Sequence, residues 1–220
     1  MRIALIGGTG LVGSSLVDLL LEREDGPEVH ALVRRRTGRT HPRWHEVAAP
    51  AERWPELVRG IAPDAAVSML GTTMRAAGSQ AAFRAVDFDA VLGFAAAARE
   101  AGARRMVTVS SAGANAGSRN FYLRTKGEME AALQALGFER LDIFRPGLLR
   151  GARGGDRRLG ERIGIVLSPI ANLFLQGPLD RYAAIDAVTV AAAAQACLGL
   201  AAPGTFVHDN RAIRRLAAHL

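Results

Sequence analysis

The sequence of 220 residues contains very little lysine and cysteine and no long hydrophobic run. Of its 28 lysine and arginine residues, Lys126 is the only lysine and the other 27 are arginines. The single cysteine, Cys197, excludes an intrachain disulfide, so we expect a reducing, cytoplasmic compartment and a buried structural thiol. No signal peptide pattern and no run of about 18 apolar residues is present, so neither secretion nor a membrane span is expected.

Positive charge exceeds negative charge by 7, which raises the question of a nucleic-acid partner. The arginines are scattered, however, and only Arg34, Arg35 and Arg36, with Arg39 nearby, form a cluster. Without a nucleic-acid motif, this cluster predicts a local anion site and no nucleic acid. The apolar content of 49% is typical of a globular protein, and the length favours one domain over residues 1–220.

A glycine-rich turn near the start of the chain follows a short apolar run, Ile3 to Ile6. Gly8, Gly10 and Gly13 match G-x-G-x-x-G, and Gly7 with the last two also matches G-x-x-G-x-x-G. Leucines and valines then recur at helical spacing, which makes a strand, a turn and a helix. Glycine lets the backbone approach a pyrophosphate, and the helix N-terminus supplies free N–H donors. The turn therefore predicts a dinucleotide site.

The residues after the second predicted strand, Val29 to Val33, indicate which dinucleotide is bound. An acidic residue at this place selects NAD by binding the ribose 2′-hydroxyl. This chain has Arg34 and Arg35 there instead, and guanidinium groups bind a 2′-phosphate in bidentate fashion. We expect NADP (as NADPH), the alternative being a solvated basic turn.

The remaining pattern alternates strands and helices, which predicts an α/β fold with a doubly wound parallel sheet, the Rossmann fold. His41 and His45 are four residues apart, but Pro42 argues against a helix that would place them on one face. No metal site is therefore expected. The segment 151–180 is expected to form a substrate-side loop and helix, followed by a small C-terminal helical cap. The other expected strands are Val47-Ala48, Ala65 to Leu70, Met106 to Val109, Leu141 to Phe144 and Phe206-Val207. The expected helices are Glu52–Gly60, Ser79 to Ala101 with a buried face of Phe83, Val86, Ala90, Phe94 and Ala97, Asn120 to Leu136, Glu161–Phe174 and Arg211–Leu220.

Tyr122 and Lys126, the sole lysine, lie one turn apart on the helix that Asn120 caps, and therefore on one face. A phenol is a poor proton donor at neutral pH, but a neighbouring ammonium stabilises its phenolate form. Ser111 ends the preceding strand, where its hydroxyl can hold a substrate carbonyl against Tyr122. Together the three residues predict a Ser-Tyr-Lys catalytic site.

The segments GGTGLVG, LGTTMRAAGS, VSSAGANAGSRNFYLRTKGEMEAAL and FRPGLLRG together resemble the short-chain dehydrogenase/reductase superfamily. More narrowly, they are similar to its atypical branch with the Tat-interacting-protein oxidoreductases. The resemblance implies catalysis by Ser111, Tyr122 and Lys126. It implies that NADP contacts residues after each of several strands, namely Gly7, Thr9, Gly10, Leu11, Val12, Gly13, Arg34, Arg35, Leu70, Gly71, Thr72, Ser110, Tyr122, Lys126, Pro146, Gly147 and Leu148.

Two departures from the family pattern leave alternatives open. The usual acid after the third strand is replaced around Ala48-Ala49-Pro50, and the spacing from Ser111 to Tyr122 is short, so Ser110 remains a rival for the serine role. Sugar-nucleotide epimerases share the motifs but are longer, which favours a small carbonyl or quinone-like substrate here. The alternative is an NADP-binding regulator with little turnover that acts through protein partners. A monomer or a homodimer is expected.

Overall fold

The computed structural model describes residues 1–151 and 182–218, and one sheet organises this part of the chain. The sheet has seven strands in the order β3-β2-β1-β4-β5-β6-β9, and every neighbouring pair is parallel. Its strands are β1 (Arg2–Ile6), β2 (Glu28–Val33), β3 (Trp44–Ala48), β4 (Ala65–Ser68), β5 (Arg105–Val109), β6 (Arg140–Phe144) and β9 (Gly204–His208). A second, two-stranded sheet pairs β7 (Leu149–Arg150) with β8 (Ile185–Asp186). The predicted doubly wound fold is confirmed.

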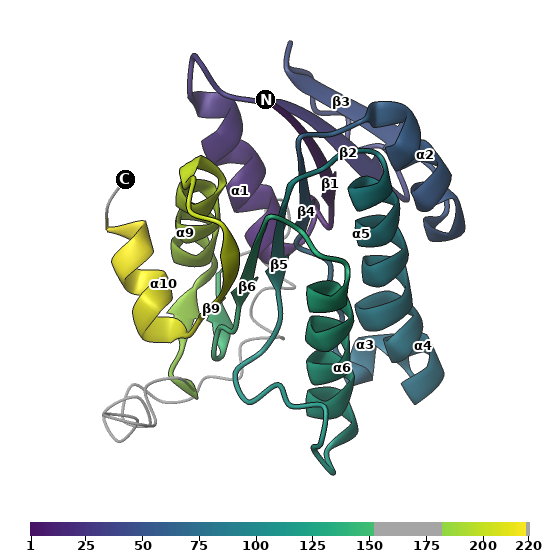
Figure 1. The fold of residues 1–220 in the computed structure, drawn as a ribbon, viewed down its shortest axis with the longest axis vertical. Helices are drawn as coiled ribbons and strands as arrows, with labels where there is room; N and C mark the ends of the chain where they lie inside the picture. Colours follow the sequence, from purple (N-terminus) through teal and green to yellow (C-terminus); the bar gives the residue numbers. More distant parts are fainter. Residues whose placement is uncertain (152–181, 219–220) are drawn as a thin grey trace.

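Helices cover both faces of the sheet (Figure 1). One layer consists of α1 (Leu11–Glu22), α9 (Ala187–Gly199) and α10 (Asn210–Ala217). The other contains η1 (Ala51–Arg53), α2 (Trp54–Ile61), α3 (Met74–Ala77), α4 (Gln80–Arg84), η2 (Ala85–Ala90), α5 (Val91–Glu100) and α6 (Phe121–Ala135). None of these helices, in the described residues, is long and apolar enough to cross a membrane.

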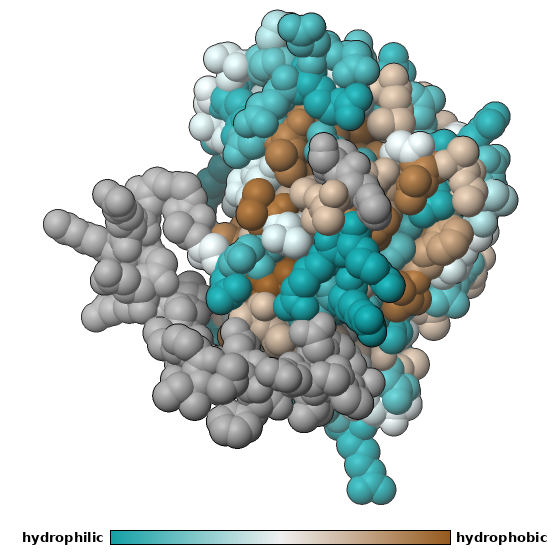
Figure 2. All heavy atoms as spheres, turned by 90° about the vertical axis from the view of Figure 1, so that its left-hand side faces the viewer, coloured by the Kyte–Doolittle hydropathy of each residue, from teal (hydrophilic) through white to brown (hydrophobic). Residues whose placement is uncertain are grey.

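Alternating residues of the central strands build a core on each face of the sheet. Ile3 and Leu5 of β1 pack with α1 and α9, whereas Ala4 and Ile6 pack with α2, α5 and α6. This alternation follows from the two-residue period of a strand. Burying a side chain such as Leu5 contributes about 1.5–3 kcal/mol. The outer face over α1, α9 and α10 mixes hydrophobic and hydrophilic areas (Figure 2).

The chain changes direction in the sheet between β1 and β4. From β1 it proceeds outward to β2 and β3, and it then returns to place β4 on the other side of β1. Ligands of open parallel sheets bind at the carboxyl ends of the strands beside such a switch point. The glycine turn follows β1 at this edge, so the fold places the predicted dinucleotide site where a ligand is expected.

Several predicted boundaries differ from the structure. The third strand starts at Trp44 rather than Val47. The fourth ends at Ser68 rather than Leu70. Met69 N still donates a hydrogen bond to Ile6 O, but Leu70 then lies against Gly7 of the glycine turn. Helix α9 and the β7–β8 pair were not predicted, since an alanine-rich segment has weak periodicity and two-residue strands have none. The expected features between 152 and 181 lie outside the described residues.

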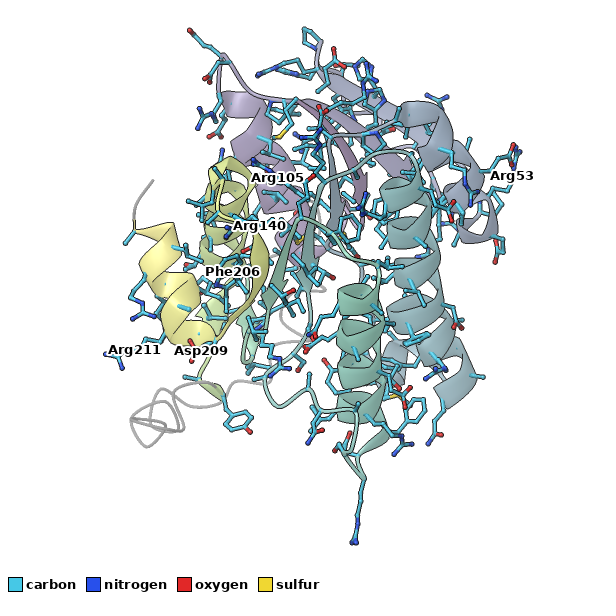
Figure 3. All side chains as sticks on the ribbon, in the orientation of Figure 1. Arg53, Arg105, Arg140, Phe206, Asp209 and Arg211 are labelled. Atoms are coloured by element: carbon cyan, nitrogen blue, oxygen red, sulfur yellow. The ribbon has the colours of Figure 1, made fainter. Side chains whose placement is uncertain are left out.

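A buried polar group, which we call the Asp142 cluster, attaches β9 to β6 on the α9 face. Asp142 accepts hydrogen bonds from Arg140 Nε at 2.7 Å and Nη2 at 2.9 Å, and lies 2.8 Å from His208 Nε2. The Arg140 guanidinium lies 4.3 Å from the centre of the Phe206 ring (Figure 3). Cys197 Sγ of α9 completes the group, 3.9 Å from His208 Nε2.

The surroundings of the Asp142 cluster determine its protonation. Burial opposes ionisation of Asp142, but hydrogen bonds from His208 and Arg140 outweigh it and place the pKa of this carboxyl below its usual value. Burial, followed by the charge of Asp142, raises the pKa of the Cys197 thiol to about 12. The thiol is therefore protonated at neutral pH and a poor nucleophile, which agrees with the structural role expected for Cys197.

Candidate dinucleotide and catalytic site

The glycine turn shows which of the two overlapping patterns the backbone requires. Gly7 has a φ of +78°, and a Cβ there would lie 2.3 Å from Leu70 N. A Cβ on Gly13 would lie 2.1 Å from Gly7 O, whereas one on Gly8 would meet side-chain atoms alone, Leu5 Cδ2 at 3.1 Å and Val17 Cγ2 at 3.6 Å. The clashes with backbone atoms are at Gly7 and Gly13, so the wider pattern that starts at Gly7 is the one that the backbone requires.

Helix α1 begins directly after this turn with its first N–H groups available. Gly10 is the N-cap, no side chain caps the helix, and no acid lies in its first turn. Uncapped N–H donors at a helix start attract an anion, and the helix dipole adds to the attraction. Leu11, Val12 and Gly13 thus present backbone donors where a pyrophosphate would bind, and Thr9 lies exposed just before them.

Arg34 and Arg35 are exposed directly after β2, where the adenosine end of the cofactor is expected. The connection that follows them is held by Glu46 of β3, which accepts a hydrogen bond from Thr37 N at 3.0 Å. Burial opposes the charge of Glu46, but the Thr37 hydrogen bonds place the pKa of its carboxyl below the usual value. Glu46 therefore holds the connecting loop and leaves both arginines exposed.

Tyr122 and Lys126 lie in the first turns of α6, which Asn120 caps by accepting a hydrogen bond from Leu123 N at 3.1 Å. Lys126 is only 3% exposed. Its Nζ lies 2.7 Å from Asp87 Oδ1 and 3.5 Å from Val109 O at the end of β5. The ring of Tyr122, one turn earlier, is half-buried with its centre 5.3 Å from that of Phe83. The helix thus directs the ammonium to the carboxyl edge of the sheet.

Asp87, the partner of Lys126, is a residue that the sequence analysis missed. It is fully buried in η2, a π-helical turn inside the long helix that Ser79 caps. Val86 was predicted on the buried face of this helix, but it is only partly buried. The π turn shifts the register of the helix, so that Asp87 faces the inner side instead. Such turns concentrate at functional sites. In the sequence, the only signal for Asp87 was its position as an acid among apolar residues of a predicted helix.

Asp87 also orders the loop after β4. Its Oδ2 accepts a hydrogen bond from Thr72 N at 2.8 Å. A Cβ on Gly71 would lie 3.5 Å from Asp87 Oδ1 and 3.9 Å from Lys126 Nζ. Leu70, Gly71 and Thr72 therefore pass directly over the buried ion pair. We call Asp87 and Lys126, with Thr72 N and Val109 O, the Lys126 cluster.

The two candidate serines after β5 have different surroundings. Ser110 is 5% exposed, and within the described residues its buried hydroxyl has no hydrogen-bond partner. Ser111 is partly exposed, and its hydroxyl makes one long contact, 3.4 Å to Ala112 O. A buried hydroxyl without a partner is uncommon and marks a place where a bound molecule can supply one. Both hydroxyls therefore remain open to a ligand.

The segment after β6 is fixed by two contacts that the sequence did not predict. Arg145 donates to both oxygens of the buried Glu130 on α6, at 3.0 and 3.1 Å from Nε. The fully buried Asn210 of α10 accepts a hydrogen bond from Gly147 N at 2.9 Å and donates one to Ala183 O at 2.7 Å. Pro146, Gly147 and Leu148 are thus held beside α6, and no local sequence signal identifies Asn210.

These observations fit a dinucleotide. Free N–H donors lie at the start of α1, exposed arginines follow β2, and a buried ammonium lies at the end of β5. All follow strands that end at the same edge of the sheet, which is the arrangement of dinucleotide sites in such folds.

Comparison with known proteins shows the family to which the chain belongs. The model of the NAD(P)H-binding family matches residues 7–164. "Protein FMP52, mitochondrial" of Coccidioides immitis is 37% identical over 228 residues, covering 97% of this chain and 92% of that protein. The protein of the same name from Candida albicans is 34% identical over 200 residues, covering 87% and 86%.

Solved structures show the same fold at low sequence identity. The enzyme WbmH of Bordetella bronchiseptica, in complex with NAD+, superposes with a TM-score of 0.69 at 18% identity, covering 99% of this chain and 79% of that one. UDP-glucose 4-epimerase of Thermotoga maritima, with UDP-glucose, gives 0.67 at 14% identity, covering 99% and 82%. At this identity the likeness concerns the fold alone.

The names of the fungal relatives correct one expectation. The chain was expected to be cytoplasmic, but relatives in several fungi are named mitochondrial proteins, so that expectation is wrong. A single cysteine excludes an intrachain disulfide without distinguishing among compartments where thiols stay reduced. The narrower likeness to the Tat-interacting-protein branch stays a prediction. Taken together, the family match, the fungal relatives and the fold show that this chain belongs to the NAD(P)H-binding family and has a Rossmann fold.

Proposed function

We propose that the protein is an NADP-dependent oxidoreductase that transfers a hydride to or from a small carbonyl or quinone-like substrate. The observation that carries this proposal is the buried Lys126 ammonium, held by Asp87 and Val109 O one turn from Tyr122 at the ligand edge. A surface Tyr–Lys pair would need neither the burial nor the acid partner. Residues 1–220 form one NADP-binding domain in this proposal.

The three catalytic residues have separate tasks. Ser111 donates a hydrogen bond to the substrate oxygen, a role that its partial exposure favours over that of the buried Ser110. Tyr122 gives its phenolic proton to that oxygen, and Lys126 stabilises the phenolate and binds the nicotinamide ribose. The nicotinamide, when bound, supplies or accepts the hydride. The backbone from Pro146 to Leu148, fixed by Asn210, lines the nicotinamide side.

The remaining cofactor contacts follow from the positions of the other strand ends. The backbone around Gly10 binds the pyrophosphate, and the segment from Leu70 to Thr72 lies beside it over the Lys126 cluster. Arg34 and Arg35 bind the 2′-phosphate, which selects NADP over NAD.

The catalytic assignment is tested with two variants. Tyr122→Phe removes only a hydroxyl and should lower turnover by about 10²–10⁴-fold, the usual loss for a general acid. Lys126→Arg keeps the charge but should also fail, because a planar guanidinium cannot take the place of a compact ammonium beside Asp87. The measurement is NADPH oxidation with a panel of aldehydes, ketones and quinones, and titration of NADPH into each variant serves as the binding control.

Two outcomes would contradict the catalytic assignment. If both variants reduce an accepted substrate as fast as the parent, Tyr122 and Lys126 are not catalytic. If the parent binds NADPH tightly but turns over no member of the panel, the regulatory alternative replaces the enzyme.

The cofactor assignment is tested separately. Replacing both arginines, Arg34→Ala with Arg35→Ala, should weaken NADPH binding by tenfold or more, since a charge-assisted hydrogen bond contributes about 1.5–3 kcal/mol. NADH binding should not change. Arg53→Ala is the matched control, because its side chain is 59% exposed in η1. Equal losses for NADPH and NADH, or equal affinities in the parent, would contradict the selection of NADP by these arginines.

A further inference from the structure

A group of two histidines and a glutamate lies away from the ligand edge, at the amino ends of β2 and β3. His30 and His45 are opposite each other in the parallel register of these strands. Glu28 precedes His30 by two residues and therefore lies on the same face of the sheet. One ligand atom from each of the three side chains lies within 4.8 Å of the other two.

The atoms of this group are close but not hydrogen bonded to one another. His30 Nε2 lies 3.7 Å from Glu28 Oε2, which is too long for a hydrogen bond. The imidazole rings of His30 and His45 are stacked with their centres 4.7 Å apart. Within the described residues, the buried Nε2 of His30 has no hydrogen-bond partner. An unsatisfied buried nitrogen beside a second imidazole and a carboxylate indicates that a further group is accommodated there.

We propose that Glu28, His30 and His45 bind one zinc ion. Imidazole nitrogens and a carboxylate oxygen are a common ligand set for Zn²⁺, with bonds of about 2.0–2.2 Å that place neighbouring ligand atoms about 3.3 Å apart. The three ligand atoms lie within 4.8 Å of one another, so zinc binding requires the side chains to rotate and close this distance. Glu28 and His45 are exposed, so water has access to the fourth coordination position.

Glu28 also forms an ion pair with Arg2, and this pair contributes little to stability. Arg2 Nε lies 3.6 Å from Glu28 Oε2, and the two side chains are 47% and 53% exposed. Exposed pairs of this kind contribute about 0–1 kcal/mol. A zinc ion bound to three ligands therefore displaces Arg2 at little cost.

The place of the group in the fold indicates a structural role. In the described residues β3 is an edge strand that pairs with β2 alone, and residues 34–43 join the two strands without a helix. This loop is held by side-chain contacts, including Arg39 to Asp18 at 2.7 Å and Arg43 Nη2 to Leu21 O at 2.9 Å. Zinc at the amino ends would link β3 to β2 and stabilise the loop that begins with the exposed Arg34 and Arg35.

The test uses the full chain without a histidine tag, stripped with a chelator and titrated with ZnCl₂ by calorimetry. A single site is expected, together with a zinc-dependent rise in the unfolding temperature, because an ion that binds the folded state stabilises it. Mg²⁺ should give neither effect, since it prefers oxygen ligands. The signal does not depend on NADPH binding or turnover.

Variants identify the ligands. His45→Gln and Glu28→Gln, both at exposed positions, should each weaken zinc binding by more than about tenfold and remove the thermal shift. His41→Gln is the matched control, because His41 is near in sequence but outside the group, and it should bind zinc like the parent. The proposal is overturned if the parent does not bind zinc, if His45→Gln and Glu28→Gln bind it unchanged, or if His41→Gln loses it equally. Circular dichroism confirms that each variant is folded.

Discussion

Two buried clusters of charged residues lie on opposite faces of the sheet and differ in how completely their polar atoms are paired. In the Asp142 cluster both carboxylate oxygens accept hydrogen bonds from Arg140, and one also lies against His208. In the Lys126 cluster the ammonium makes one short contact with Asp87 and one long contact with Val109 O.

This difference indicates a structural role for the Asp142 cluster and a functional role for the Lys126 cluster. A guanidinium bound in bidentate fashion is fixed in place by its carboxylate partner. An ammonium has three donors on a flexible stem, so Lys126 retains the capacity to bind another oxygen. The Asp142 cluster therefore joins β9 to β6, whereas the Lys126 cluster is available for chemistry at the ligand edge.

The largest expected effect in this comparison comes from Asp142→Asn. Loss of the carboxylate leaves the buried Arg140 charge unpaired, which should lower the free energy of unfolding by about 3–5 kcal/mol. Urea unfolding followed by circular dichroism measures it. Glu100→Gln is the control, because it breaks an Arg–carboxylate pair on the surface and should cost no more than about 1 kcal/mol. Equal losses in the two variants would remove the distinction between buried and surface pairs.

The same isosteric change at the other cluster, Asp87→Asn, should affect stability less and turnover more. The Lys126 side chain has a flexible stem and can move toward solvent, which a guanidinium fixed by several hydrogen bonds cannot do. We expect a loss of about 1–3 kcal/mol and at least a tenfold fall in turnover, because the ammonium is no longer held beside Tyr122. Parallel unfolding and NADPH-oxidation assays compare the two variants. A stability loss as large as that of Asp142→Asn with unchanged turnover would make both clusters structural.

The smallest expected effect is on the pH dependence of stability. Because the folded pKa of Asp142 is below its unfolded value, its contribution is complete above about pH 4 and is lost as the pH falls through the folded pKa. The difference in unfolding free energy between the parent and Asp142→Asn should therefore be constant from pH 5 to 7 and shrink toward pH 3. Urea titrations at each pH measure it. A difference that does not change with pH would show that the Asp142 carboxylate is not the titrating group.

Much of the fold could be predicted because its signals are local. The apolar run of β1 and the helical spacing after it are read from adjacent residues, as is the cap of α6 at Asn120. The glycine spacing is also local, although only the structure distinguishes Gly7 from Gly8 as the constrained position. Helix α9 was missed because alanine favours a helix but gives little contrast between its faces.

The sequence by itself determined the order of the seven sheet strands and of most helices, the glycine turn and the placement of Tyr122 and Lys126 on one helical face. These depend on neighbours within one or two turns of the chain, whose spacing is set by backbone geometry. Tertiary structure decided that Asp87 faces Lys126, that Asn210 holds Gly147, and that His30 meets His45. Each of these contacts joins different secondary-structure elements, so it exists only once the register of the strands and the rotation of the helices are set by packing.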